Sequence, residues 1–343
     1  MNYDKPFVPL DDLIIKLKER GLKISDDNYA KNILRSYSYY DLINGYKNIF
    51  MPNTTFNPNT TIEFLRDIYI LDKEIQSLCI KYSLIIETKF KNTIAEVISS
   101  KFGVHQDDYL DTRHFKDNKK NNNKSNNKRN NNLSIESVKI EILRATIPKT
   151  AQQPTKHYIE KHNHIPPWIL FKNISLGATI NLFNLLLKDD KKDVVDLLIP
   201  NDSITFSEKV NFISVSLDAI RRFRNSGAHN LNFVNCKVKY PLPLPVLKKL
   251  LPDCLFNNPN GYEYLSDKDS ITGIYGIILC FLILITDIDL KIKLIHEFKS
   301  ILYFPYGPYD NVIRQILHGP YKALARIPYN TSDRLSYYKD TLK

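Results

Sequence analysis

The sequence predicts an all-α fold, and three observations lead to it. Apolar residues in several long segments recur every three or four positions, which is the spacing of an amphipathic helix rather than of a strand. The chain has only 10 glycines in 343 residues and its apolar runs are short, which disfavours a β-rich architecture. Hydrophobic residues make up 43% of the chain, too many for a disordered protein. We therefore expect a helical bundle with few or no short strands.

The N-terminal segment predicts two helices followed by an aromatic cluster. In LDDLIIKLKERGL, Asp11 and Asp12 lie where a helix N-terminus favours anions, and Gly21 supplies a left-handed stop. A second helix is expected from Asp26 or Asp27 to about Leu34. The next segment is rich in tyrosine, and packing at a helix junction is favoured over stacking on bases. Its tyrosines are Tyr37, Tyr39, Tyr40 and Tyr46.

The middle of the chain predicts long helices around a polar insertion. Apolar residues from Thr61 to about Phe102 keep helical spacing, which predicts one helix or two in succession. Asp117 to Asn132 has no apolar residue to bury and is expected to be a flexible loop, although its basic charge is compatible with RNA contact. Helical patterns resume from Ser134 to Ile147 and from Trp168 to Leu187.

The last third predicts a helix from about Ser207 to Arg224, a proline-broken segment from Tyr240 to Pro252, and a core helix. The apolar run from Gly273 to Thr286 is shorter than the roughly 20 residues that span a bilayer, so a buried helix is expected. Two amphipathic helices follow, at Leu290 to Leu302 and Asn311 to Leu324. We expect an N-terminal helical region over 1–60 and a helical domain over 61–343 with the insertion at 117–132.

Composition and motifs exclude several classes of protein. The four cysteines lack paired spacing, so neither a disulfide framework nor a zinc site is expected. The sequence has no glycine-rich phosphate loop, which argues against an ATP- or dinucleotide-dependent enzyme. The cluster His157, His162 and His164 lacks a cysteine partner, and we expect no metal there and no cofactor. The N-terminus has no secretion signal, so a cytoplasmic protein without a membrane partner is expected. The net charge of +11 favours a polyanionic partner such as nucleic acid or an anionic membrane surface, but an AT-rich genome produces the same bias.

One short stretch carries residue types suited to RNA cleavage. In RFRNSGAHN, Arg224 and His229 are separated by four residues, and Asn225 directly follows the arginine. A histidine moves protons near neutral pH, and an arginine stabilises charge on a phosphorane formed by attack of the 2′-hydroxyl. Five positions of an unbroken helix amount to about 500°, which leaves the two side chains about 140° apart. Gly227 is therefore expected to stop or distort the helix and turn both toward one cleft.

A single motif supplies one histidine, whereas the reaction needs both an acid and a base. A symmetric dimer with two motifs face to face would supply two histidines and two arginines in one composite site.

The motif resembles that of HEPN-superfamily ribonucleases, and the chain from Lys5 to about Ile285 resembles the abortive-infection Abi family of AbiD and AbiF type. The similar stretches, in order, are KERGLKISDDNYAKNIL, SYYDLINGY, IYILDKEIQSL, IIETKFKNTI, IPPWILFKNISLGATINLF, RFRNSGAHN and GIYGIILCFLIL. The family usually carries RN-x-CAH, and here Ser226 and Gly227 occupy the middle positions while Arg224, Asn225 and His229 are intact.

The resemblance implies a HEPN-like helical bundle that acts in phage defence as a toxin-like, metal-independent ribonuclease, as a homodimer, and in association with a small non-coding RNA. It implies catalytic roles for Arg224 and His229, with Asn225 orienting the histidine or the phosphate. The expected RNA-backbone contacts are Arg221, Arg222, Lys237 and Lys239. Two alternatives stay open: an RNA-binding module without catalysis, and a signalling scaffold that senses a phage protein.

Overall fold

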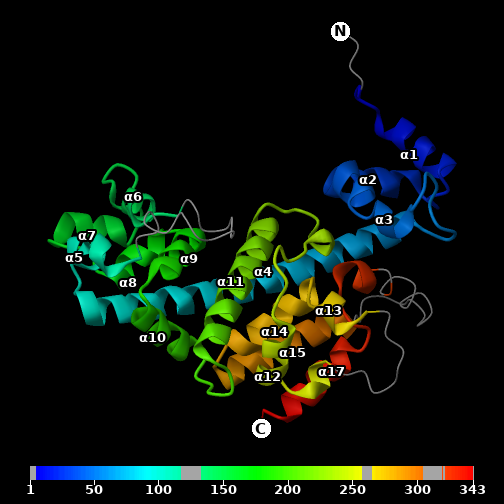
Figure 1. Ribbon diagram of the computed structural model, residues 1–343. Coiled ribbons are helices and arrows are strands. Elements are labelled where there is room, and N and C mark those ends of the chain that lie inside the picture. Colours follow the sequence, from blue (N-terminus) through cyan, green and yellow to red (C-terminus); the bar gives the residue numbers. More distant parts are fainter. Residues whose placement is uncertain (1–4, 117–132, 257–264, 304–318, 320, 343) are drawn as a thin grey trace, which may run out of the picture.

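The computed structural model describes residues 5–116, 133–256, 265–303, 319 and 321–342. These residues form helices and no sheet (Figure 1), and their strand-like pairings are two isolated bridges, Lys23 with Thr61 and Phe115 with Leu186. The predicted all-α fold is confirmed. The expected loop Asp117–Asn132 lies outside the described residues, as does most of the expected helix Asn311–Leu324.

The N-terminal helices form as the sequence predicts. The Asp26 carboxylate accepts hydrogen bonds from the amides of Asn28 and Tyr29 and caps the second helix, while Gly21 takes a positive φ of 87° after the first. The tyrosine cluster packs inward at Tyr46, which is fully buried, whereas Tyr40 is 69% exposed. The elements here are α1 (Leu10–Glu19), α2 (Asp27–Tyr37), a π-helical turn (Tyr40–Asn44) and α3 (Lys47–Phe50).

One helix, α4 (Ile62–Phe102), runs through the middle of the molecule (Figure 1). Its 41 residues extend over about 60 Å at 1.5 Å per residue. The Thr61 hydroxyl accepts the Phe64 amide at its start, and Gly103 with φ 85° ends it. The sequence left open one helix or two, and the structure has one.

A lobe of short helices covers the C-terminal half of α4. The single helix expected from Trp168 to Leu187 is wrong, because the Ser175 hydroxyl accepts the Ala178 amide and starts a new helix there. The elements are α5 (Gln106–Tyr109), a 3-10 turn (Thr112–His114), α6 (Ile135–Leu143), a 3-10 turn (Arg144–Thr146), α7 (Thr155–Lys161), α8 (Pro167–Leu170), a 3-10 turn (Phe171–Asn173), α9 (Leu176–Leu185) and α10 (Lys188–Leu198).

The helix α11 (Phe206–Ala228) crosses α4, and the C-terminal helices pack beneath the crossing (Figure 1). A reciprocal capping box between Thr205 and Glu208 starts α11 one residue before the expected Ser207. The remaining elements are a 3-10 turn (Phe233–Asn235), α12 (Leu244–Leu250), a 3-10 turn (Asp253–Leu255), α13 (Asp267–Ser270), α14 (Ile274–Leu284), α15 (Ile288–Tyr303) and α17 (Thr331–Asp340).

The predicted core helix is α14, whose residues from Ile274 to Leu282 are all buried. It packs on α4 together with α8, α9, α10, α11 and α15. Among the described residues, no helix has both the length and the apolar character needed to cross a bilayer.

A buried carboxylate on α4 joins distant parts of the chain. Asp72 is fully buried and its Oδ1 accepts the Val234 amide at 2.7 Å and the Tyr321 hydroxyl at 2.8 Å. Its Oδ2 accepts the Phe233 amide at 2.8 Å and the Tyr46 hydroxyl at 3.2 Å. Burial raises the pKa of Asp72, and the hydrogen bonds from Phe233 and Tyr321 act in the opposite direction.

Asp72→Asn should destabilise the fold by about 1–3 kcal/mol, the usual cost of a buried donor left unpaired. In either orientation the new amide places an NH₂ group against one of two backbone N–H groups, and neither can accept a hydrogen bond. Denaturant unfolding measures the change. Glu96→Gln, at an exposed position of the same helix, is the matched control and should leave the unfolding midpoint unchanged, and equal midpoints for the two variants would contradict the role given to Asp72.

Candidate functional site

The motif lies in the last two turns of α11 and in its C-terminal cap. The helix stays regular through Gly227 and ends at Ala228. The Asn230 amide donates to the Gly227 carbonyl and the Leu231 amide to the Ser226 carbonyl, both at 3.0 Å, which is the Schellman pattern. The residue with positive φ is Asn230, at 54°. The expectation that Gly227 stops or distorts the helix is therefore wrong.

Gly227 instead allows α11 to lie close against α4. A β-carbon at this position would lie 2.8 Å from Cγ1 and 2.9 Å from Cδ1 of Ile80. The Gln76 side-chain amide donates to the Gly227 carbonyl at 2.6 Å. The close contact between α11 and α4 therefore requires a glycine at this position. The same contact holds the C-terminal end of α11, which carries the motif, in place against α4.

Arg224 is held between its neighbour and a buried acid. Its Nη1 donates to Asn225 Oδ1 at 3.1 Å, and its Nη2 lies 3.9 Å from Glu87 Oε2. Glu87 is 8% exposed, and its Oε1 accepts the Lys91 ammonium at 2.6 Å. Its Oε2 has no hydrogen-bond partner among the described residues. A buried carboxylate oxygen therefore faces the guanidinium with unused accepting capacity.

Lys91 connects this pair to the lobe. Its ammonium group also donates to the Ile174 carbonyl at 2.7 Å, in the segment between the 3-10 turn and α9. The ion pair on α4 thereby positions the segment that lies opposite Arg224.

Two adjoining cavities of about 470 and 360 Å³ open beside Arg224, and together we call them the Arg224 groove. Both are lined by Glu87, Lys91 and Arg224. Among the described residues, the basic ones that line the groove are Lys91, Lys172, Arg221 and Arg224, and the acidic one is Glu87. Trp168, which is 44% exposed, adds an aromatic surface to one wall. A basic groove with an exposed aromatic ring suits single-stranded nucleic acid.

His229 does not face this groove. It forms the C-cap of α11, is exposed, and belongs to neither cavity. Because the helix continues to Ala228, the rotation of about 500° over five positions leaves His229 on a different face from Arg224. Within one chain the two motif residues are therefore not brought to one cleft.

The remaining predicted RNA contacts lie at different places, and among Arg221, Arg222 and Lys237 only Arg221 lines the groove. Arg221 lines the groove and pairs with Asp218 at 2.8 Å, whereas Arg222 is exposed and lines neither cavity. Lys237 donates to the main-chain carbonyls of Val234 and Leu324, and burial, with Arg326 nearby, lowers its pKa to about 8.

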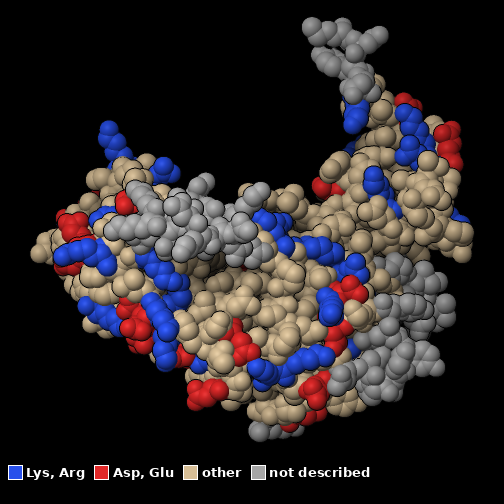
Figure 2. All heavy atoms as spheres, in the orientation of Figure 1, with Lys and Arg blue, Asp and Glu red and all other residues tan. Residues whose placement is uncertain are grey.

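Lys239 is exposed and its ammonium lies 5.2 Å from the centre of the Tyr240 ring. Figure 2 shows further Lys and Arg side chains along the concave edge of the molecule beside the end of α11.

Sequence reasoning missed Glu87, Lys91, Lys172 and Trp168 as parts of the site. A signal for the first two was present, because Glu87 and Lys91 are four positions apart in IIETKFKNTI, the spacing of a helical ion pair. Lys172 and Trp168 reach the groove only because of how the lobe folds, and no local sequence pattern predicts that arrangement.

Of the predicted histidine cluster, His157 and His162 pack against each other, whereas His164 Nδ1 lies 2.8 Å from Asn163 Oδ1. The rings of His157 and His162 lie 5.5 Å apart, and Tyr158 and His162 are 4.4 Å apart. In the part of the chain that the structure describes, no group of three or more His, Cys, Asp or Glu side chains is arranged to hold a metal ion.

Comparison with known proteins gave one family. A family model described as Abi-like protein matches residues 32–235, which is more than half of the 343 residues. The matched region contains α4, the lobe and α11 with the whole motif. No curated protein and no solved structure matches the chain.

Gly227→Ala should destabilise the protein by about 1–2 kcal/mol, because overpacking costs about 1–3 kcal/mol and the gain in helix propensity is only about 1 kcal/mol. Ile80→Ala removes the clashing atoms, so the cost of Gly227→Ala should shrink in that background. The measurement is a double-mutant cycle of unfolding free energies.

Gly177→Ala is the matched control in another helix. Its β-carbon would meet Ser175 at 3.6 Å and Arg221 at 3.8 Å, which are ordinary contacts, so this variant should be as stable as the parent or more so. A Gly227→Ala cost that stays the same without the Ile80 side chain would refute the close contact as the reason for the glycine.

Proposed function

The chain belongs to the Abi-like protein family, and from this premise we propose that it acts in abortive-infection defence as a metal-independent endoribonuclease. The observation that carries the proposal is Arg224 in a basic groove, with its guanidinium held by Asn225 and facing the buried Glu87. Association with a small non-coding RNA stays a prediction.

The proposed substrate is single-stranded RNA. The groove offers Lys172, Arg221 and Arg224 for phosphates and the exposed Trp168 for a base. An arginine fork binds a phosphate with two parallel hydrogen bonds. Arg224 would stabilise the charge that develops when the 2′-hydroxyl attacks the neighbouring phosphorus.

We assign proton transfer to His229 and propose that a second chain supplies it. Because His229 and Arg224 of one chain lie on different faces of α11, a single chain does not place the imidazole at the phosphate held by its own Arg224. A twofold dimer around the exposed ends of α11 would present the histidine of each chain to the arginine of the other.

A non-catalytic RNA-binding module is the second candidate. It is favoured by one observation, that no histidine lines the Arg224 groove of the described chain. In that case Arg221 and Arg224 would hold a regulatory RNA without cutting it.

The purified protein should cut single-stranded RNA in excess EDTA, leave DNA intact and form 2′,3′-cyclic phosphate and 5′-hydroxyl ends, because the nucleophile is the substrate's own 2′-hydroxyl. Arg224→Ala and His229→Ala should each lower cleavage about 100-fold or more. Lys16→Ala, at an exposed position of α1, is the control and should retain cleavage. Gel analysis of end-labelled RNA measures all three.

Mixtures of parent and His229→Ala chains test the shared site. Mixed dimers lack one histidine, so activity should fall more steeply than the fraction of parent chains. A linear fall, or an active monomer in sedimentation, would exclude the two-chain mechanism. RNA binding without cleavage under every condition would leave the binding module as the function.

Glu87→Gln should reduce cleavage about tenfold, equivalent to about 1.4 kcal/mol in the barrier, while RNA binding becomes tighter. The amide can still accept from Lys91, but the change removes the negative charge that faces the Arg224 guanidinium in the groove. Cleavage rates and filter-binding affinities give the two values. The exposed Glu96→Gln should change neither, and tighter binding with undiminished cleavage would limit Glu87 to a structural role.

A further inference from the structure

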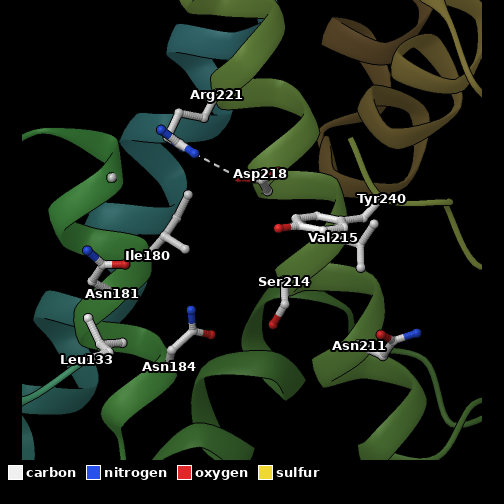
Figure 3. Close-up of a pocket in the computed structure, with 11 residues that line it drawn as sticks. Leu133, Ile180, Asn181, Asn184, Asn211, Ser214, Val215, Asp218, Arg221 and Tyr240 are labelled. Carbon is white, nitrogen blue, oxygen red and sulfur yellow. Dashed lines mark hydrogen bonds and ion pairs between the residues drawn. The ribbon is translucent and has the colours of Figure 1, made fainter. Parts of the chain in front are cut away.

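A third cavity, of about 480 Å³, lies between α9 and α11, and we call it the amide cavity (Figure 3). The asparagines Asn181 and Asn184 reach it from α9, and Asn211 and Ser214 from α11. Both pairs have i, i+3 spacing, which places their members on one face of each helix. Two polar helix faces therefore meet across the cavity.

These four side chains have unused hydrogen-bonding capacity. In the described part of the chain, none of them takes part in a side-chain hydrogen bond; the one contact at Asn184 is made by its main-chain carbonyl, which accepts the Lys191 ammonium. Each amide offers two N–H donors and a carbonyl acceptor, and the hydroxyl offers one donor and two acceptor positions. A ligand in the cavity would meet donors and acceptors on both sides.

The remaining lining suits a flat ring. Ile180, Val215 and Leu133 supply apolar surface, and the Tyr240 ring lies beside Val215 with its hydroxyl toward the cavity (Figure 3). Of the described lining residues, the charged ones are Asp218 and Arg221, which pair with each other at 2.8 Å. A lining with balanced charge, many amides and an aromatic ring favours a neutral, polar ring over an anion.

The amide cavity adjoins the Arg224 groove. Gly177 and Arg221 line both. Along α11, polar residues at three- and four-residue spacing lead from one to the other, namely Asn211, Ser214, Asp218, Arg221 and Asn225. The 13 steps from Asn211 to Arg224 span about 20 Å, so one short strand of RNA can occupy both sites.

We propose that the amide cavity binds an unstacked nucleobase of single-stranded RNA, a few nucleotides from the phosphate at Arg224, and gives the protein a base preference. The site rests on the proposed function for its RNA, but not on catalysis. Asparagine side chains recognise base edges through paired donor and acceptor contacts, and proteins read single-stranded RNA by extruding bases onto aromatic rings and polar groups. Arg221, at the junction, would contact the phosphate between the two sites.

The test measures binding in the His229→Ala background, so that cleavage does not interfere. Fluorescence anisotropy with labelled hexamers of A, C, G and U should show one base preferred by about tenfold or more, in line with a single good base contact. The double variant Asn181→Ala/Asn184→Ala should lose that preference and bind all four hexamers alike. Asn48→Ala, an exposed asparagine on α3, is the control and should keep it.

A second double variant, Asn211→Ala/Ser214→Ala, removes the polar side chains that line the cavity from α11 and should also abolish the base preference. Because two independent variants are compared, a folding defect in one of them does not determine the conclusion. Loss of preference in a protein that never cuts RNA would support the base site and overturn the nuclease. Cleavage by the unmutated protein, together with a base preference that survives both double variants, would overturn the base site and leave the nuclease standing.

Discussion

The four hydrogen bonds that Asp72 accepts determine how the rest of the molecule is arranged. They come from the N-terminal region, from the segment after α11 and from the C-terminal region. A buried carboxylate without donors would be strongly unfavourable, so the three segments have to converge on the N-terminal third of α4. Two of the donors are the amides of Phe233 and Val234, a few residues beyond His229. The same carboxylate therefore fixes where the chain goes after the motif.

The second constraint is the crossing of α11 over α4. Gly227 lets the backbones approach at Ile80 and Gln76, and one turn earlier Arg224 reaches Glu87. The long helix thus carries both the contact that needs a glycine and the acid that faces the arginine. Since α4 also holds the lobe through Lys91 and the Ile174 carbonyl, a single rigid element sets both walls of the groove.

Local sequence patterns predicted individual helices well where a cap, an apolar run or a clear periodicity marked them. The caps at Asp26 and Gly21, the apolar run of α14 and the periodicity of α4 each led to the observed helix. The break at Ser175 was missed because the apolar pattern continues across it, and only a capping hydrogen bond interrupts the helix. Gly227 was misread because its role depends on α4, whose contacting residue Gln76 is 151 positions away in the sequence, rather than on its neighbours. The local motif was enough to single out Arg224, whereas Lys172 and Trp168 join the groove only through the tertiary fold of the lobe.

The regularity of α11 changes how its motif has to be understood. Had the helix broken at Gly227, one chain could have turned arginine and histidine toward one cleft. With the helix intact, Arg224 belongs to a groove shared with the lobe, and His229 to the exposed end beside the Schellman cap. A spacing of five positions on a rigid helix therefore separates Arg224, the proposed phosphate-binding group, from His229, the proposed proton-transfer group. In a nuclease of this design, an isolated chain would bind RNA without cutting it, and association of two chains would be the step that completes the active site.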